Sequence, residues 1–532
     1  MYEKITGMGY NFIRSDSDQV FLLPPDTRDW LPEGHLAWEI IKVVDTLDLS
    51  AFLASYRADG QGRPAYHPKM LVALVAYCYC KGIRSSRAIE GACFDDLGCR
   101  VICGNCQADH ATIARFVRRH AAALQQLFVQ VLAVCARDGL VRVDLVAGDG
   151  TKVRANASKA TSRTVEQLDV RIQELEAALA AEVAAWFAQA AAEDAAEDAL
   201  FAGDGDGPND GSAPSSASAS TRKRTADQLA RAQAAKDVLH QRHGDTIGAQ
   251  TALQQARARA QTATARLERV TAAQQAKVER QQQREQVKTA GGKASAGRPP
   301  LPVDQAPKVI AAQTALDKAQ TALRRAEADP HKGAAPKGNP TDPASRVMPA
   351  KTGGYLQGYN LQALANPNQV ILAIGTHDNS TDVGALHPLL NQARANLDAA
   401  GITDPIGRAL FDAGYAATDN FTIDTEADLY VAVHNETAQT GRGDAVDKTM
   451  PAGWQPMAAR MATEEAKQLY RERPGIIEPV FAQLFARLGR HLNYRGAMVD
   501  VELSLWGTTH NLLKHIRHLA SQAMTRPAPT LT

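Results

Sequence analysis

Residues 143–158, VDLVAGDGTKVRANAS, hold the acidic residue Asp149 directly after an apolar run that is typical of a β-strand. A second acid, Asp412, follows another such run in ALFDAGYAATDNF (409–421). The third, Glu478, lies in YRERPGIIEPVFAQLFARLG (470–489), where we expect it to open an amphipathic helix. If the chain brings them together, three carboxylates supply the hard oxygen ligands that divalent metal ions prefer in phosphodiester chemistry.

The stretches around these acids predict an α/β core with a mixed sheet flanked by helices. LVRVDLVAG (140–148) is typical of a strand, the Gly-Asp-Gly after it signals a turn, and TKVRA (151–155) is a short extended piece. The later predicted elements are strands at 353–365 and 369–377, separated by Asn-Pro-Asn, a helix at 381–401, and strands at 406–414 and 428–435.

Residues 1–138 predict an all-helical N-terminal domain that binds DNA. We expect one helix at His67–Cys80, a second after the N-cap residues Ser85 and Ser86, and a longer third from Asp109 to Gly139. The opening turns of the third helix carry Arg115, Arg118 and Arg119. This pattern resembles a helix-turn-helix module that presents a basic turn to DNA, but an ordinary solvated helix face explains the spacing equally well.

Residues 161–349 predict a long helical insertion in a core formed by 139–160 and 350–532. A short coiled-coil seam is indicated by the spacing of Leu168, Ile172, Leu175 and Leu179. We expect 202–222 to be disordered, 223–288 and 304–329 to be helical, and 289–303 to form a Gly/Pro break. Between 251 and 300, ten Lys or Arg stand against three Glu, so the insertion is either an arm for DNA or a partner subunit, or a solvated helical hairpin.

The last part of the chain predicts three helices after a linker at 436–453. The first spans 456–471 and is broken by Pro474-Gly475. The second has an apolar face formed by Val480, Phe481, Leu484, Phe485 and Leu488. The closing helix lies within 495–520.

Composition excludes several classes of protein. The 532 residues include 59 basic and 58 acidic side chains, a net charge of +1, so a nucleic-acid partner has to be met by local patches. We expect a soluble, cytoplasmic protein, because neither a signal-peptide pattern nor an apolar stretch of membrane-spanning length is present. Seven cysteines, an odd number, argue against a disulfide scaffold. Cys99, Cys103, Cys106 and His110 admit a zinc cluster, but reduced thiols in a helical domain are the favoured interpretation.

Taken in order, these motifs resemble the insertion-sequence DDE transposases. The resemblance is to the branch in which a DHxTIxRF-type N-terminal domain precedes a ribonuclease-H-like, retroviral-integrase-like catalytic core. It rests on LLPPDTRDWLPEGHLAW (22–38), YHPKMLVALVAYCYCKGIRSSRAIE (66–90), DHATIARF (109–116), DGTKVRANAS (149–158), GYNLQA (358–363), DAGY (412–415), YRERPGIIEPVF (470–481) and NYRG (493–496). Any one of these is weak, but their shared order makes the resemblance specific.

The resemblance implies that Asp149, Asp412 and Glu478 are the three catalytic acids and hold two Mg²⁺ ions, with Mn²⁺ as a substitute. It implies DNA transposition, in which water frees a 3′-OH at the element end and that hydroxyl attacks target DNA. Tyr470 and Arg473 lie where the family's tyrosine and arginine contact the DNA phosphate. The implied partners are double-stranded DNA, as terminal inverted repeats and as target, and a second copy of the chain in a homodimer on DNA.

The chain departs from the family at Phe485, seven residues after the glutamate, where a lysine is usual. Arg487 is then the candidate to supply that charge for DNA. Two alternatives to a transposase stay open. One is a metal-dependent DNA nuclease on the same core, which cuts without joining. The other is a catalytically inactive, DNA-binding remnant.

Each acid of the trio also has a purely structural explanation. Asp149 is part of a turn signal, Asp412 suits an Asx turn at a strand end, and Glu478 suits the first turn of a helix. Four further acids compete for the site. They are Asp144 within the first predicted strand, Asp378 and Asp382 where helix capping is expected, and Glu502 in the closing helix.

Overall fold

The described part of the chain divides into two compact units. The computed structural model describes residues 12–13, 26–59, 61–62, 64–201, 216–243, 252–289, 300–328, 336–350, 353–423, 425–433 and 452–525. One unit comprises Met1–Thr161 and Ala344–Thr532, and the other comprises Ser162–Pro343. No helix in the described ranges combines the length and apolar character needed to cross a membrane.

The N-terminal part of the first unit is helical, as predicted. Its helices are η1 (Thr27–Trp30), α1 (Leu36–Asp45), α2 (Ser50–Leu53), α3 (Pro68–Cys80), α4 (Ser86–Asp95), α5 (Leu97–Ile102), α6 (His110–Arg119) and α7 (Ala121–Arg137), with β1 (Phe12–Ile13) paired to β2 (Ala65–Tyr66). The N-caps of α4 and α6 are Ser85 and Asp109, whose side chains accept hydrogen bonds from backbone N–H groups. Helix α3 is central, because almost all of its residues are buried.

The single long helix predicted from Asp109 to Gly139 is wrong, since two helices meet at His120. His120 leaves the helical conformation, with φ −105° and ψ 27°. Its ring packs against Phe52 and Phe116, with centroids 5.2 and 4.7 Å away. Tertiary packing therefore bends a segment whose local sequence favours one helix.

The core of the first unit is a six-stranded mixed sheet. Its strands are β3 (Leu145–Arg154), β4 (Arg346–Pro349), β5 (Tyr355–Ala365), β6 (Ile371–His377), β7 (Arg408–Phe411) and β8 (Asp428–Val431), in the order β4-β5-β3-β7-β8 with β6 also paired to β5. β5 is antiparallel to β3, β4 and β6, whereas β7 is parallel to β3 and β8 is parallel to β7. The predicted mixed α/β class is thus confirmed.

Asp149 lies inside a strand rather than after one. β3 runs without interruption from Leu145 to Arg154, so the turn predicted at Gly-Asp-Gly is absent from it. Gly148, Asp149 and Gly150 pair with Leu364, Ala363 and Gln362 of β5. The long antiparallel partner holds these residues extended and overrides the local turn signal.

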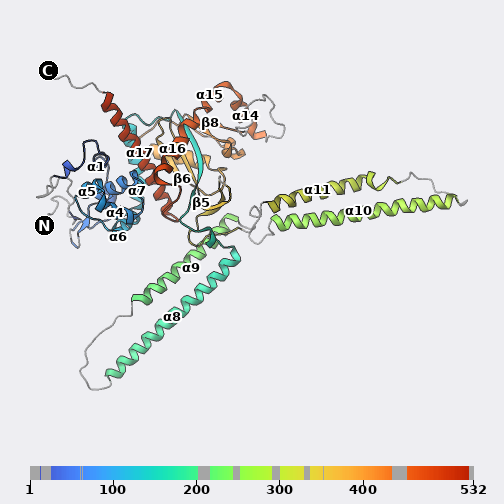
Figure 1. Ribbon diagram of the computed structural model, residues 1–532, viewed down its shortest axis with the longest axis horizontal. Coiled ribbons are helices and arrows are strands. Elements are labelled where there is room, and N and C mark those ends of the chain that lie inside the picture. Colours follow the sequence, from blue (N-terminus) through green and yellow to red (C-terminus); the bar gives the residue numbers. More distant parts are fainter. Residues whose placement is uncertain are drawn as a thin grey trace. The chain divides into compact units, whose positions relative to one another are not determined.

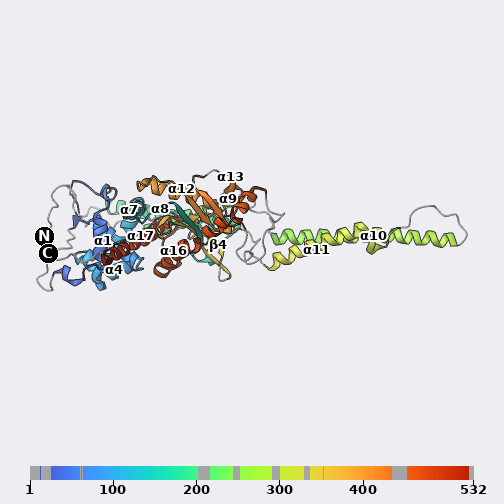
Figure 2. The ribbon, with the colours of Figure 1, turned by 90° about the horizontal axis from the view of Figure 1, so that it is seen from above.

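Helices α12 (Leu386–Ala399), α16 (Arg473–Leu488) and α17 (Met498–Thr525) pack against the sheet (Figures 1 and 2). Helix α17 also contacts α7 and α3, so the sheet and the N-terminal helices share one hydrophobic core. The closest approach is at Gly507, where a Cβ atom would lie 2.7 Å from the ring of Phe128 and 3.0 Å from Ile374. The short elements of the sheet unit are η5 (Ala413–Tyr415), α13 (Thr418–Thr422) and η7 (Ala452–Trp454).

Two helix boundaries differ from prediction near the third acid. The helix predicted at 456–471 is two helices, α14 (Gln455–Ala462) and α15 (Glu464–Tyr470), because Thr463 caps a new start. Pro474-Gly475 does not break a helix but lies in the first turn of α16, where proline is tolerated. Pro479 inside α16 has no N–H, and the Gly475 carbonyl four residues earlier instead accepts a hydrogen bond from Gln369 Nε2 at 3.2 Å.

The second unit consists mainly of long helices, as predicted. They are α8 (Val165–Phe201), α9 (Ser216–His243), α10 (Ala252–Thr289) and α11 (Pro307–Ala328), with the short 3-10 helix η4 (Val303–Gln305) between α10 and α11. The 3-10 helix η2 (Lys159–Thr161) belongs to the first unit. Helices α8 and α9 run side by side, and so do α10 and α11 (Figure 1). The predicted seam is present, with Leu168 and Leu175 of α8 buried and Leu168 packed on Ala235 and Leu239 of α9.

The disorder predicted for 202–222 is wrong for 216–222, which begin α9, whereas 202–215 lie outside the described residues. The helical tract predicted over 223–288 is two helices, α9 and α10. Residues 244–251, between these helices, also lie outside the described residues. Residues 290–299 of the predicted Gly/Pro break and 436–451 of the predicted linker lie outside the described residues as well.

Candidate active site

The first two acids of the trio lie at the same level of two neighbouring parallel strands. β3 and β7 pair Ala147 with Leu410. If this register is extended by two residues, Asp149 on β3 lies opposite Asp412, which follows β7 directly. Equal register in a parallel pair places two side chains on the same face of the sheet. The strand pairing therefore brings two carboxylates together from distant parts of the chain.

Arg473 links these two acids. Its Nη2 atom lies 3.1 Å from Oδ1 of Asp149 and 3.7 Å from Oδ2 of Asp412. Arg473 is the first residue of α16 and is only 4% exposed. Burial by itself lowers the pKa of Arg473, but the charges around it, that of Asp149 foremost, raise the pKa above its usual value. The site thus holds one buried positive charge between two negative ones.

Each acid also makes a local hydrogen bond. Oδ1 of Asp149 accepts from the Gly150 N–H at 2.9 Å. Oδ1 of Asp412 accepts from the Gly414 N–H at 2.9 Å and caps η5. The Asx-turn explanation of Asp412 and a role in the site are compatible, because Oδ2 of the same carboxylate faces Arg473.

The buried phenol of Tyr415 adjoins the pair. Its hydroxyl donates to Oε1 of Gln362 on β5. Burial raises the pKa of Tyr415 well above its usual value, and the negative charges of Asp382, Asp149 and Asp412 add to this effect. Tyr415 therefore stays protonated, and its hydroxyl fixes which way the Gln362 amide points.

A further carboxylate, that of Asp382, lies beside the pair, and the capping role predicted for it is wrong. The N-cap of α12 is Ala385, which makes no side-chain cap. Oδ1 of Asp382 instead accepts from Nδ2 of Asn360 at 2.9 Å and from Nε2 of Gln362 at 2.7 Å. The sequence does carry a signal for this contact, since Asn360 and Gln362 lie on one face of a largely apolar strand.

Glu478 is the acid that the structure does not bring to the pair. It is the sixth residue of α16, not its opening residue, and its side chain is exposed. The buried side of α16 is formed by Arg473, Ile476, Ile477, Val480, Phe481, Leu484 and Leu488. Across the described ranges, no group of three or more His, Cys, Asp or Glu side chains is placed to hold one metal ion, and this includes the cysteines of α4, α5 and the segment after them.

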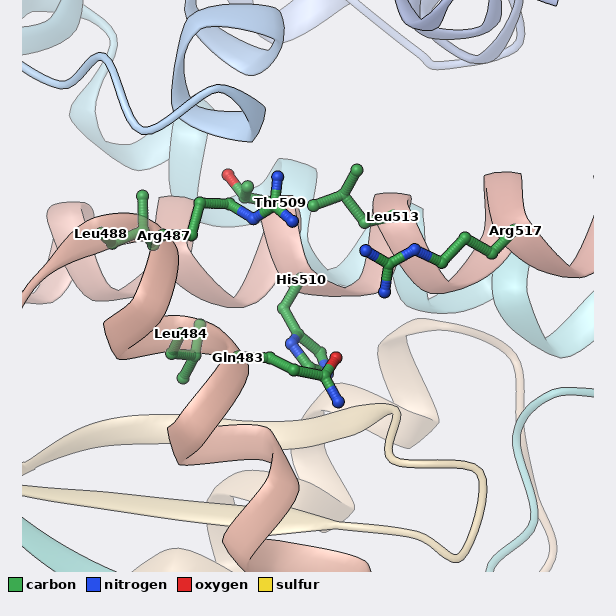
Figure 3. A pocket seen from close by; sticks show the side chains of 8 residues that line it. All are labelled: Gln483, Leu484, Arg487, Leu488, Thr509, His510, Leu513 and Arg517. Carbon is green, nitrogen blue, oxygen red and sulfur yellow. The ribbon is translucent and has the colours of Figure 1, made fainter.

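The residues predicted to contact DNA near the third acid have protein neighbours. Tyr470, at the end of α15, is buried and lies close enough to Arg473 to affect its pKa. Arg487 donates a hydrogen bond to the backbone carbonyl of Cys80 in α3. Figure 3 shows Arg487 with His510 and Arg517 around a small pocket between α16 and α17. Arg487 therefore joins α16 to the N-terminal helices.

The three arginines of α6 are exposed, as a DNA-contacting face requires. Arg118 Nε donates to the carbonyl of Ala114 at 3.2 Å, which lies in the same helix. Arg119 donates to the carbonyl of Ser55, and its guanidinium lies 5.0 Å from the ring centroid of Tyr56. Arg115 completes this basic face.

The remaining competing acids have structural partners. Asp144 precedes β3, is half exposed and pairs with Arg142 at 2.9 Å. Asp378 pairs with Arg346 at 3.0 Å. Glu502 is fully buried and pairs with Arg84 at 3.0 Å.

Two family models match the chain. A model described as "Transposase domain (DUF772)" matches residues 25–119, and one described as "Transposase DDE domain" matches residues 327–512. Together they span more than half of the chain, and the second implies a ribonuclease-H-like core for the sheet unit. No curated protein and no solved structure matches the chain.

Proposed function

The chain belongs to the DDE transposases, whose DDE domain implies DNA binding, polynucleotidyl transfer and DNA transposition, and we propose that it is the transposase of an insertion sequence. In this proposal it binds the terminal inverted repeats of its element as a homodimer, cuts the DNA there and joins the freed 3′ ends to target DNA. One observation carries the proposal: Asp149 on β3 and Asp412, directly after the parallel strand β7, lie at equal register, and both contact Arg473.

DDE transposases generally use divalent metal, and the two carboxylates of this site supply oxygen ligands of the kind that such an ion prefers. Two carboxylates already converge on one buried cation, the guanidinium of Arg473. We assign Asp149 and Asp412 as ligands of Mg²⁺, with Mn²⁺ as a substitute. When bound here, such ions would supply activation of the attacking oxygen and stabilisation of the leaving oxygen of a phosphodiester. Glu478 is retained as the third acid because it follows Arg473 on the same helix, about one and a half turns away.

The chain's own residues have separate tasks in this proposal. Arg473 holds both carboxylates in place before an ion binds, because its positive charge offsets their mutual repulsion. Tyr415 and Gln362, which are joined by a hydrogen bond, lie beside the two carboxylates. The exposed arginines of α6 contact the DNA backbone, where they neutralise phosphate charge.

The test uses the full-length protein and labelled duplexes taken from both flanks of its own reading frame, with Mg²⁺ or Mn²⁺. We expect nicked and joined products from the wild type. Asp149→Asn and Asp412→Asn should give neither product while still shifting the duplex in a gel. Asp144→Asn, which alters an exposed acid paired with Arg142, is the matched control and should react normally. Cleavage without joining would replace the proposal with a nuclease, and binding alone would replace it with an inactive remnant.

A further inference from the structure

Helix α10 of the insertion is strongly basic, and its positive charge lies on one side. It carries eight Lys or Arg against three Glu, whereas α8 carries one Arg against nine Asp or Glu. Six of the eight recur at intervals of 7, 3, 8, 3 and 4 residues. At 100° per residue this spacing places them within an arc of about 80°. We call these six residues the basic stripe: Arg259, Arg266, Arg269, Lys277, Arg280 and Arg284.

The basic stripe lies on the exposed surface of α10, beside its contact with α11. The two helices run next to each other, and Ala256 and Ala260 belong to the buried side of α10 (Figure 1). All six side chains of the stripe are exposed. Glu268 and Glu279 lie outside the arc of the stripe, on another side of the helix. The stripe is therefore a continuous positive surface that its own hairpin does not cover.

The charges of the stripe are not arranged to stabilise the hairpin itself. In the other hairpin, Lys236 of α9 pairs with Asp169 of α8 at 2.6 Å. Within the described ranges, no acidic side chain forms an ion pair with any of the six stripe residues. The stripe instead places Lys277, Arg280 and Arg284 one turn apart. Like charges at this spacing destabilise a helix, and a bound polyanion removes that repulsion.

The dimensions of the stripe suit duplex DNA. From Arg259 to Arg284 the helix advances by about 38 Å, which is roughly the length of one turn of B-DNA. Thr262 and Ala273, which lie among the basic residues on the same side, are small. They leave a phosphate backbone free to approach the guanidinium groups.

We propose that the basic stripe of α10 binds the phosphate backbone of duplex DNA without reading its sequence. The proposal rests on the proposed function, which brings DNA to this chain. DNA fits the stripe better than the acidic α8 of a second copy does. The acidic positions of α8 recur on all sides of that helix, whereas DNA offers regularly spaced charges.

The test compares the full-length wild type with the combined variant Arg266→Gln, Arg269→Gln and Arg280→Gln, in which glutamine keeps the helix propensity. Fluorescence anisotropy measures binding to a duplex from the flank of the reading frame and to an unrelated duplex, at several salt concentrations without metal. We expect the slope of log affinity against log salt to fall by about three on both duplexes, since each phosphate contact contributes about 0.9.

The matched control removes the same charge from the other hairpin. It combines Lys223→Gln, Arg224→Gln and Arg231→Gln, three exposed positions of α9. Its slope should match that of the wild type, because α9 lies beside the acidic α8. Thermal unfolding should be the same for both variants, so that a lost slope is not a lost fold.

The outcomes separate this inference from the proposed function. A stripe variant with the wild-type slope overturns the inference, even where the wild type nicks and joins DNA. If that variant also loses self-association in sedimentation without DNA, the stripe binds a second copy instead. A loss confined to the flanking duplex overturns the sequence-independent contact. If the wild type neither nicks nor joins but the variant has the lower slope, the proposed function fails and the DNA contact of the stripe stands.

Discussion

Arg84 and Glu502 form a buried ion pair, with Nη1 of the arginine 3.0 Å from Oε1 of the glutamate. The same carboxylate accepts hydrogen bonds from the backbone N–H groups of Asn493 and Tyr494. The guanidinium lies 5.4 Å from the ring centroid of Trp506. This pair ties the segment between α3 and α4 to α17 and to the loop before it. Glu502 therefore stabilises the packing of these segments against one another, and it takes no part in the acid site.

Glu502→Ala should lower the free energy of unfolding by about 3–5 kcal/mol, because it leaves the charge of Arg84 buried without its partner. Urea unfolding followed by circular dichroism measures this loss. Asp144→Ala breaks a half-exposed pair and should cost less than about 1 kcal/mol. Equal losses in the two variants would show that the Arg84–Glu502 pair does not stabilise the fold.

Gly150→Ala should disturb the site, whereas Gly475→Ala should not. A methyl group on Gly150 would lie 2.5 Å from Nε2 of Gln362 and would overlap with the Asp382 carboxylate, so side chains must shift at a cost of about 1–3 kcal/mol. Gly475 has no atom within 4 Å of that position and lies in the first turn of α16, where alanine favours the helix. Thermal unfolding of the two variants compares them. A Gly150→Ala variant as stable as Gly475→Ala would contradict the close packing around Gly150.

Much of the fold could be predicted from periodicity, but contacts between distant segments could not. The runs around β5, β6 and α12 have clear local signals, and these elements occur where they were expected. The Asp-Gly dipeptide at Asp149 predicts a turn, and only the pairing of β3 with β5 overrides this local signal.

The acid site shows the same limit. Asp149 and Asp412 are recognisable from their motifs, but the bridge from Arg473 depends on how α16 packs on β3. The sequence predicts a helix cap at Asp382, because its actual partners, Asn360 and Gln362, lie on the strand β5 and are distant in sequence. No local pattern specifies a hydrogen bond between a loop and a strand, so only the polar residues in the apolar run of β5 pointed to it.

Stability should fall between neutral and mildly acidic pH because of His510. Burial first, and then the positive charges of Lys514, Arg517 and Arg487, lower the pKa of His510 from 6.5 to about 4. Its Nε2–H donates to the carbonyl of Gln369 at 2.7 Å. Below pH 6.5 the unfolded chain takes up a proton that the folded chain refuses until about pH 4, so stability is lost as the pH falls through this window.

The expected loss from His510 alone is about 2 kcal/mol between pH 7.5 and pH 5. His510→Gln keeps a donor near the Gln369 carbonyl but cannot titrate, so it should lose less stability than the wild type over the same range. Urea unfolding at the two pH values measures both. If the variant and the wild type lose the same amount, His510 does not control this acid sensitivity.

Arg490 should contact DNA, and Arg487 should not. Phe485 stacks on Phe481, with centroids 5.9 Å apart, and the exposed guanidinium of Arg490 lies 4.3 Å from the centroid of the Phe485 ring. Arg490 therefore brings a positive charge to the position where lysine is usual, whereas Arg487 is engaged by the Cys80 carbonyl. Arg490→Gln should reduce the slope of log affinity against log salt by about one, as the loss of one phosphate contact does. Arg487→Gln should leave that slope unchanged and lower the thermal stability. Gel-shift titrations on the flanking duplexes at several salt concentrations measure the slopes, and a loss of slope confined to Arg487→Gln would reverse the assignment.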